Sequence, residues 1–437
     1  MAGSGQGASD AREAAARVFR EESGRAVASL IRVLGDFDLA EEAVQEAFIS
    51  ALETWPERGV PANPGAWITT TARNRAVDRL RRRQRLREKT ELLGRQALIE
   101  EELAALEPGD DDAEDAAMPI TDDRLRLIFT CCHPALSLDA RVALTLRTLG
   151  GLSTPEIARA FLVPEPTLAQ RLVRARKKIR DAGIPYRVPP EDLLPERLGG
   201  VLRVLYLVFN EGYAASSGDA LVRRELSTEA IRLARLVVRL LPTEPEAAGL
   251  LALMLLHDAR RPARVTDDGA LVLLEDQDRS RWDRDRIDEG RSLVEGALAA
   301  GRPGPYQVQA AIAALHDTAP TAADTDWAQI AALYAALVAL EPTPVVALNH
   351  AVAVAMAQGP AVGLALMDGL AADGTLDDYP YLHAGRADLL RRLGRWTEAA
   401  AAYQRALEST VSGPERTFLE RRMAAVAQAA TGQARPD

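Results

Sequence analysis

Residues 151–180 constrain the fold most, because two short amphipathic patterns flank a tight break there. Ser153, followed three residues later by Glu156, fits a capping box at the start of a first helix. Pro164 ends that pattern, and Pro166 suits the first position of a second helix, where its missing N–H is not needed. The inward stripe of the second helix is Leu168, Leu172, Ala175 and Ile179. This arrangement predicts a helix-turn-helix.

The outward face of the second helix is polar and mostly basic. It carries Thr167, Gln170, Arg171, Arg174, Arg176, Lys177 and Lys178. Between Arg171 and Arg180 there are six basic residues and no acid. A helix in a DNA major groove needs this chemistry for phosphates and base edges. A helical hairpin with a solvated basic face is the alternative.

A second basic helix is predicted for residues 67–89, which hold nine Arg or Lys and two acids. Its apolar residues recur at helical spacing, so one face is buried and the arginines are left for phosphates. The preceding segment, 59–65, contains two prolines and two glycines and predicts a loop. Trp67 beside this loop either stacks on an unpaired base or packs in the core.

An acidic helix is predicted just before that loop, at residues 38–52. Its polar face carries several carboxylates, which a phosphate backbone would repel. A basic protein partner is therefore the functional interpretation, and a solvated helix face is the plain one.

The order of these motifs resembles bacterial sigma factors of the extracytoplasmic-function group, group 4 of the sigma-70 family. DLAEEAVQEAF is similar to the family's helix that docks on the beta-prime clamp helices of RNA polymerase. NPGAWITTTARNRAVDRLRRRQR is similar to the part that opens and reads the minus-ten promoter element. GLSTPEIARAFLVPEPTLAQRLVRARKKIR is similar to the reader of the minus-thirty-five element. The resemblance implies an all-α protein that directs core polymerase to promoters and helps to open them.

The residue patterns and the resemblance together predict three sets of site residues. The core-polymerase set is Asp38, Glu41, Glu42, Gln45, Glu46 and Phe48. The minus-ten set is Asn63, Trp67, Arg73, Asn74, Asp78, Arg82 and Arg83. The minus-thirty-five set is Thr167, Gln170, Arg171, Arg174, Arg176, Lys177 and Lys178. The chain departs from the family at Leu162, Pro166, Ala169 and Gln170, so its base preference cannot be transferred.

The net charge of −10 is an average over opposed parts. Residues 100–123 hold eleven acids and no base, which predicts a self-repelling linker between the two basic helices. No apolar run reaches the roughly 18 residues of a membrane span, and the N-terminus lacks the hydrophobic stretch of a signal peptide. We therefore expect a cytoplasmic protein.

Some 250 residues follow the helix-turn-helix. Helical patterns with small residues at the offsets of tetratricopeptide (TPR) units occur in residues 227–256, 330–351 and 386–407. The alternative is an unrelated helical bundle. Between these segments, residues 267–283 break the helical rhythm, and the apolar run 271–274 predicts a strand of a short hairpin insertion. In a recognised subgroup that this arrangement resembles, the tail is thought to replace a separate anti-sigma regulator.

The predicted organisation has six parts. They are a disordered N-terminus (1–10), a sigma-2 domain (11–90), the acidic linker (91–121), a sigma-4 domain (122–184), a helical connector (185–285) and TPR-like repeats (286–430).

No catalytic motif is present, and the five histidines lack ligand spacing. The Cys131, Cys132 and His133 cluster does not have zinc-site spacing. We therefore expect no enzyme activity, cofactor or metal. The expected partners are core polymerase (beta-prime clamp helices and beta flap), promoter DNA, and a regulatory protein or ligand at the TPR-like domain, with no membrane. The alternative function is a polymerase-independent helix-turn-helix regulator with a TPR interaction domain.

Overall fold

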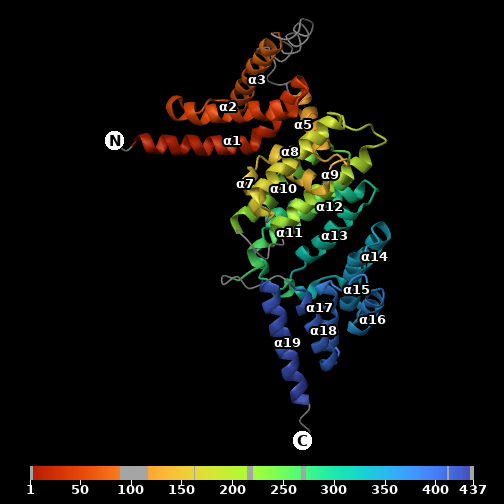
Figure 1. Ribbon diagram of the computed structural model, residues 1–437. Helices are drawn as coiled ribbons and strands as arrows, with labels where there is room; N and C mark the ends of the chain where they lie inside the picture. The colour runs from red at the N-terminus through yellow and green to blue at the C-terminus, as the bar shows by residue number, and fades with distance from the viewer. Residues whose placement is uncertain are drawn as a thin grey trace. The chain divides into compact units, whose positions relative to one another are not determined.

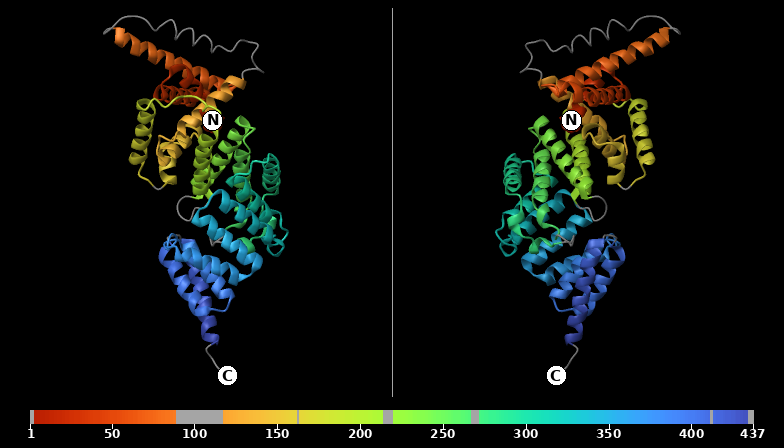
Figure 2. Two further views of the ribbon diagram at one scale, coloured as in Figure 1. Left: turned by 90° about the vertical axis from the view of Figure 1, so that its right-hand side faces the viewer. Right: turned by 90° about the vertical axis from the view of Figure 1, so that its left-hand side faces the viewer.

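The computed structural model describes residues 3–88, 117–161, 163–213, 220–266, 272–410 and 413–433. Within these ranges the chain is helical and contains no β-strand, as the all-α prediction requires (Figure 1). The chain divides into two units. Figure 2 shows its helices from two further sides. The first comprises residues 1–211 and 221–233, and the second comprises 212–220 and 234–437. No helix of the described part is long and apolar enough to cross a membrane.

The first unit is built from short and long helices in chain order. They are α1 (Gly3–Leu34), α2 (Phe37–Arg58), α3 (Pro64–Glu88), α5 (Ala117–Cys131), α6 (Leu138–Leu144), a π-helix (Thr145–Leu149), α7 (Thr154–Ala160), α8 (Glu165–Asp181), α9 (Leu194–Tyr213) and the start of α10 (Ala220–Leu240).

The helices α1, α2 and α3 pack on one another around a small-residue core. Asp36 caps α2 by accepting a hydrogen bond from the Leu39 N–H at 3.0 Å. Residues 3–10, which the sequence predicts to be disordered, instead form the first turns of α1. Adding turns to an existing helix costs little once nucleation is complete, and Ala14, Ala15 and Val18 bury the turns that follow.

The predicted helix-turn-helix is formed by α7 and α8. The capping box is confirmed, because Ser153 and Glu156 make both of its reciprocal hydrogen bonds. Pro166 lies in the first turn of α8, as predicted. After α8, Gly183 has a φ of 58°, and the Ile184 N–H donates to the Ile179 carbonyl at 2.9 Å. This is a Schellman-type end that favours glycine. Leu162, at the turn, lies outside the described residues.

Most of α9 belongs to the first unit. Arg197 Nη2 donates to the Phe129 carbonyl of α5 at 2.8 Å, and Arg232 Nη2 of α10 donates to the Leu149 carbonyl at 2.7 Å. The apolar stripe of α9 is buried at Leu198, Val201, Leu202, Leu205 and Phe209. The boundary between the units therefore falls inside the predicted connector 185–285, not at either of its ends. The acidic linker falls mostly on residues 89–116, which lie outside the described residues.

The second unit continues as a succession of helices. They are the rest of α10, α11 (Pro245–Ala259), α12 (Arg284–Ala299), α13 (Pro305–Thr318), α14 (Trp327–Leu340), α15 (Pro344–Gln358), α16 (Pro360–Ala372), α17 (Pro380–Arg392), α18 (Trp396–Ser409) and α19 (Gly413–Gln433). From α13 onward each helix packs on the next in the chain. Gly394, with a φ of 74°, makes the turn between α17 and α18.

The predicted strand at residues 271–274 is wrong for its described part. Leu274 begins a short 3-10 helix, Leu274–Asp276, and Val272 makes only one backbone hydrogen bond to the opposite side of the loop, to the Arg264 carbonyl at 2.9 Å. The apolar run is too short to form a ladder, and local turns at Asp276 and Asp278 compete with it.

Gly363 sets the approach of α16 to α15. A Cβ at this position would lie 2.2 Å from Ala355 Cβ and 2.8 Å from the Ala351 carbonyl oxygen. We expect Gly363→Ala to lower the free energy of unfolding by about 1–3 kcal/mol, because the two backbones must separate. Gly369→Ala on the same helix is the matched control, since nothing lies within 4 Å there and alanine favours helix. Urea unfolding measures both, and equal effects would contradict the packing role of Gly363.

A buried polar cluster joins the end of α11 to the end of α13. Arg260 Nε lies 3.3 Å from Asp317 Oδ1, and Arg260 Nη2 lies 2.6 Å from His257 Nδ1. Burial lowers the pKa of His257, and it lowers the pKa of His316 to about 4; the nearby Arg260 adds to both shifts. Burial also raises the pKa of Asp317 to about 6.

This cluster predicts acid sensitivity. The two histidines contribute stability above their unfolded pKa of about 6.5, and this is lost as the pH falls toward 4. The contribution of Asp317 to stability has the opposite pH dependence, because it is lost as the pH rises through about 6. Two histidines outweigh one carboxyl, so the melting temperature is expected to fall between pH 6.5 and 4.5. His316→Gln should flatten this profile and His350→Gln should not; identical profiles would contradict the assignment.

Candidate nucleic-acid interface

The acidic face of α2 is occupied by arginines in this structure. Arg79 of α3 pairs with Glu42 and Glu46. Glu41 is only 7% exposed and pairs with Arg147 of the π-helix, whose Nε lies 3.2 Å from Glu41 Oε1. Gln45 Nε2 donates to the same oxygen at 3.0 Å. The predicted core-polymerase residues of α2 are therefore brought together, but they do not present free carboxylates.

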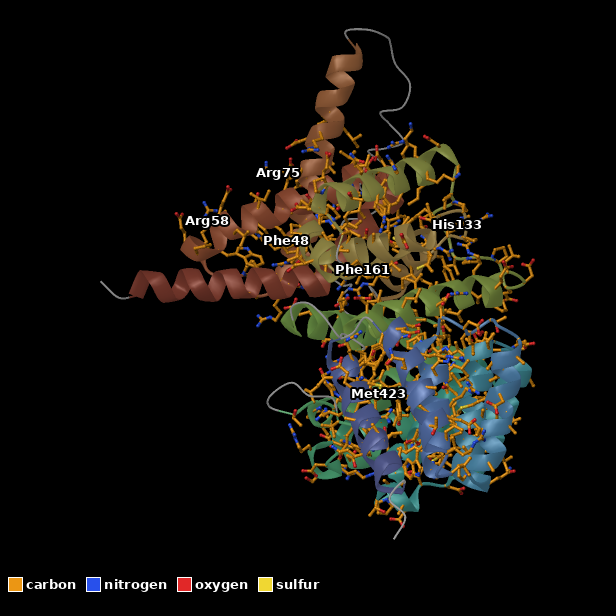
Figure 3. The ribbon with its side chains drawn as sticks, turned by 60° about the horizontal axis from the view of Figure 1, so that its bottom comes forward. Phe48, Arg58, Arg75, His133, Phe161 and Met423 are labelled. Carbon is orange, nitrogen blue, oxygen red and sulfur yellow. The ribbon has the colours of Figure 1, made fainter. Side chains whose placement is uncertain are left out.

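Phe48 differs from the rest of its set. It is 6% exposed, and its ring packs edge-on against Phe19 of α1 with the centroids 4.8 Å apart. Figure 3 shows where Phe48 lies. Its place in the structure is the core of the α1–α2 pair.

The predicted residues of α3 lie at its N-terminus and along its exposed side. Asn63 accepts a hydrogen bond from the Ala66 N–H at 3.1 Å and so caps the helix. Trp67 is half-buried and packs edge-on against the buried Trp55 with the centroids 5.6 Å apart. Asn74 and Asp78 are exposed, and Arg73 is half-buried. Arg82 and Arg83 lie in the helix, but their side chains are outside the described residues.

The residues of α8 separate into an outer face and two flanks. Thr167, Gln170, Arg174, Lys177 and Lys178 are exposed, opposite or beside the buried stripe. On one flank, Arg171 Nη2 pairs with Asp139 Oδ2 at 3.2 Å. The outer face therefore keeps a set of donors and cations that suits a DNA groove.

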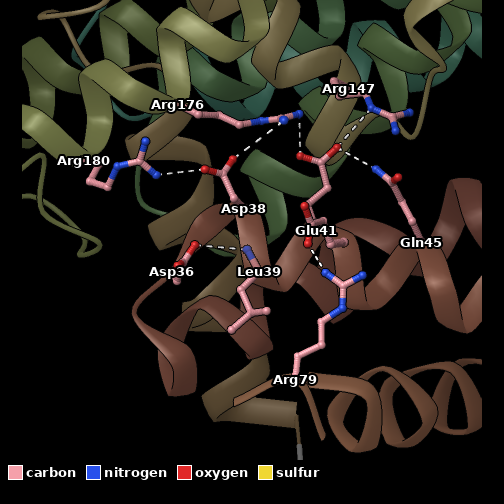
Figure 4. A network of polar contacts seen from close by, with 10 residues as sticks. Asp36, Asp38, Leu39, Glu41, Gln45, Arg79, Arg147, Arg176 and Arg180 are labelled. Carbon is pink, nitrogen blue, oxygen red and sulfur yellow. Dashed lines mark hydrogen bonds and ion pairs between the residues drawn. The ribbon is translucent and has the colours of Figure 1, made fainter. Parts of the chain in front are cut away.

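On the other flank, α8 meets α2 (Figure 4). Arg176 Nη2 lies 2.6 Å from Glu41 Oε2, and its Nη1 lies 3.8 Å from Asp38 Oδ1. Arg180 Nη1 donates to Asp38 Oδ2 at 2.9 Å. We refer to Asp38, Glu41, Arg147, Arg176 and Arg180 as the α2–α8 ion-pair cluster. In this cluster Asp38 and Glu41, which are predicted to bind polymerase, pair with Arg176, which is predicted to bind DNA.

Three residues that matter here are absent from the predicted sets: Arg79, Arg147 and Arg180. Arg147 is the only charged residue in the stretch 142–152, and a lone cation in a stretch so poor in charge is a usable signal for a buried pair. Arg79 and Arg180 lie within basic runs and have no distinguishing local pattern. Their partners are 33 to 142 residues away in the chain.

The adjacent thiols of Cys131 and Cys132 are both buried and free. Cys132 Sγ lies 3.5 Å from Thr145 Oγ1. Burial raises the pKa of both thiols, that of Cys132 to about 11. In the described residues no group of three or more side chains has the arrangement of a metal site.

Comparisons with known families match three segments. Residues 18–86 match Sigma-70 region 2, residues 126–179 match Sigma-70, region 4, and residues 197–298 match a family of unknown function, DUF6596.

Individual proteins are similar to longer parts of the chain. The chain is 45% identical over 400 residues to the uncharacterized protein R00370 of Rhizobium meliloti (strain 1021), which covers 90% of this chain and 92% of that protein. It is 29% identical over 170 residues to the ECF RNA polymerase sigma factor SigK of Mycobacterium tuberculosis (strain ATCC 25618 / H37Rv), which covers 38% of this chain and 83% of that protein. SigK of Mycobacterium ulcerans (strain Agy99) is 27% identical over 171 residues, covering 39% of this chain and 86% of that protein.

Proposed function

Because this chain belongs to the extracytoplasmic-function type of sigma factor, with an extension that it shares with the Rhizobium protein, we propose that it directs core RNA polymerase to its own set of promoters and helps to open them. Sigma factors bind core polymerase and promoter DNA and are not enzymes. A protein in this role acts in the cytoplasm, where the polymerase and the DNA are.

One observation carries the proposal beyond the family. The support is that α3 and α8 are basic helices with exposed polar side chains, at Asn74 and Asp78 and at Gln170, Arg174 and Lys177, and that α2 is an acidic helix whose carboxylates pair with arginines of α3, the π-helix and α8. The outer face of α8, with Gln170, Arg174 and Lys177, is assigned to the minus-thirty-five element. Amide and guanidinium groups there are the side chains that read base edges and hold phosphates.

The assignment of α3 to the minus-ten element rests on Trp67 and on the exposed Asn74 and Asp78. Trp67 is half-buried against Trp55, so one part of its indole is fixed while another is accessible to an unpaired base. The carboxylates of α2 are assigned to the beta-prime clamp helices, and the helix-turn-helix unit is assigned to the beta flap.

Transcription in a purified system tests this function. The chain is mixed with core polymerase and a promoter library, and the transcripts identify the promoters that it selects. We expect co-purification with core and transcripts from a defined subset. Tight binding to DNA by the chain alone, with no association with core, would favour the polymerase-independent regulator instead.

For the second unit we propose a TPR-like repeat that binds a regulatory protein or ligand. Support comes from α17 and α18, where Gly394 makes the turn and the small residues Ala399 and Ala406 are fully buried between the helices. Apolar side chains are also exposed on neighbouring helices, at Val345, Val352, Val362 and Leu366. Residues 327–372 contain only two acids, Glu341 and Asp368, and no Lys or Arg. A surface so poor in charge suits protein contact.

A further inference from the structure

The exposed side of α8 carries a large apolar side chain among its polar ones. Val173 is 61% exposed, which is the highest exposed fraction of any large apolar side chain in the part of the chain that the structure describes. The buried stripe of α8, which includes Leu168 and Leu172, packs the helix against its neighbours without this residue. The core of the helix-turn-helix therefore does not account for Val173.

Helix formation does not account for this valine either. A β-branched side chain loses rotational freedom in a helix, so valine is less favourable there than alanine or a straight side chain such as arginine or lysine. Packing offsets this loss where the side chain is buried. At Val173 most of the side chain is in contact with solvent. A partner that covers the valine would therefore gain binding energy from apolar surface that the fold leaves open.

The neighbours of Val173 indicate which partner this is. Gln170 and Lys177, three residues before it and four after it, lie on the same side of the helix, and both are exposed. The proposed function assigns both to the minus-thirty-five element. Ala169, one turn before Val173, is exposed as well, so the methyl groups of the two residues form an apolar strip beside the amide of Gln170. This strip borders the surface that the proposed function places against base edges.

In the major groove of DNA, apolar chemistry belongs to one base. Thymine presents a C5-methyl group there, whereas adenine, guanine and cytosine are read through hydrogen-bond donors and acceptors. An exposed valine is complementary to the methyl group, and it would cover the polar groups of the other bases without bonding to them.

Gln170 favours the same kind of base pair. A glutamine amide pairs with N6 and N7 of adenine, so the amide and the valine suit the two bases of A·T pairs. Three residues of a helix advance by about 4.5 Å, which is close to the spacing of about 3.4 Å between base pairs. Gln170 and Val173 can therefore contact the same short stretch of DNA.

We propose that Val173 is a specificity-determining residue that contacts the C5-methyl group of a thymine in the minus-thirty-five element. This inference rests on the proposed function and refines it, because it adds an apolar contact to a predicted set that contains only polar side chains. Arg174 and Lys177 hold the helix on the phosphates whatever the sequence, and Val173 discriminates between bases.

Removal of a single methyl group from the DNA tests the contact. Promoters selected by the full chain with core polymerase are synthesised with deoxyuridine in place of each thymine of the minus-thirty-five element in turn, which removes only the C5-methyl group. We expect one position at which the wild-type holoenzyme binds the substituted promoter about 3- to 5-fold more weakly, as the loss of one buried methyl group predicts. An element without thymine on either strand, or no loss at any thymine, would overturn the proposal.

The variant V173A assigns the loss to this residue. Its holoenzyme should bind the thymine and deoxyuridine promoters about equally, and promoter selection with it should relax the preference for thymine at that position alone. Alanine favours helix, so V173A should keep the wild-type melting temperature. The control V265A shortens an exposed valine of the second unit and should keep the wild-type response to deoxyuridine. Full discrimination by V173A would contradict the assignment.

Failure of the proposed function gives a different result. If the chain does not associate with core, no holoenzyme forms, and the proposed function fails before any promoters are compared. The thymine scan is then made on the DNA sites that the chain selects alone. A loss with deoxyuridine that disappears in V173A supports the contact there, and equal responses of V173A and the wild type overturn it.

Discussion

Truncating the chain after Arg187 is expected to unfold the helix-turn-helix domain, not merely to remove a regulatory tail. The cut deletes α9, whose Leu198, Leu202, Leu205 and Phe209 are buried in the first unit. Each such side chain contributes about 1.5–3 kcal/mol by burial, so the four together contribute about 6–12 kcal/mol, which is comparable with the whole stability of a typical domain. It also removes Arg197 from the Phe129 carbonyl. We expect the truncated chain to lose its cooperative thermal transition and to support no transcription.

The matched truncation ends after Leu240, the last residue of α10. It keeps the described helices of the first unit and deletes most of the second. We expect it to melt cooperatively by circular dichroism, and its transcription then reports on the second unit alone. Higher transcription than the full chain means that the second unit inhibits, and lower transcription means that it supports. If the chain cut after Arg187 is as stable as the one cut after Leu240, α9 does not belong to the core of the first unit.

Reversing two charges on the outer face of α8 is expected to have the second large effect. R174E/K177E replaces two cations that face the DNA with two anions, so attraction to the phosphates gives way to repulsion. At about 1–2 kcal/mol for each position, or about 2–4 kcal/mol together, promoter-directed transcription should fall by roughly 30- to 1,000-fold. The dependence of log affinity on log salt should become shallower by about 0.9 for each phosphate that the variant no longer neutralises.

The control for this variant is R405E/R421E, two exposed arginines of α18 and α19 in the second unit. It makes the same change in net charge away from the proposed DNA face. Transcription should remain near the wild-type level in the control. An equal loss in both variants would mean that the total charge of the chain, and not the outer face of α8, determines promoter binding.

Local patterns in the sequence predict the helices of the first unit well. Ser153 and Glu156 fix the start of α7, and the stripe from Leu168 to Ile179 fixes the buried face of α8, because both depend on residues one or two turns apart. The strand predicted at residues 271–274 shows the limit of this method. A short apolar run does not determine strand or helix by itself, and of the described residues there Leu274 begins a turn of 3-10 helix while 272 and 273 have no regular structure.

The partners of the polar faces could not be predicted from the same patterns. The sequence shows that Glu41 and Arg176 lie on polar sides of their helices, but not that they meet, because they are 135 positions apart in the chain. The predicted DNA-binding set of α8 includes both Arg174 and Arg176, although in the structure Arg176 is 19% exposed against α2 and Arg174 is exposed to solvent. Long-range packing determines this difference, and no residue close to Arg176 in the chain records it.

The buried thiols of Cys131 and Cys132 can serve as a native probe of transient exposure. Both thiols lie inside α5 or at its end, and burial keeps them protonated at neutral pH. An alkylating reagent therefore modifies them only while this helix is transiently exposed, since the thiolate is the reactive species. The rate of their modification therefore reports how often this helix is exposed, without any introduced label. A change of this rate when core polymerase or promoter DNA is added would show that the exposure of this helix changes during initiation.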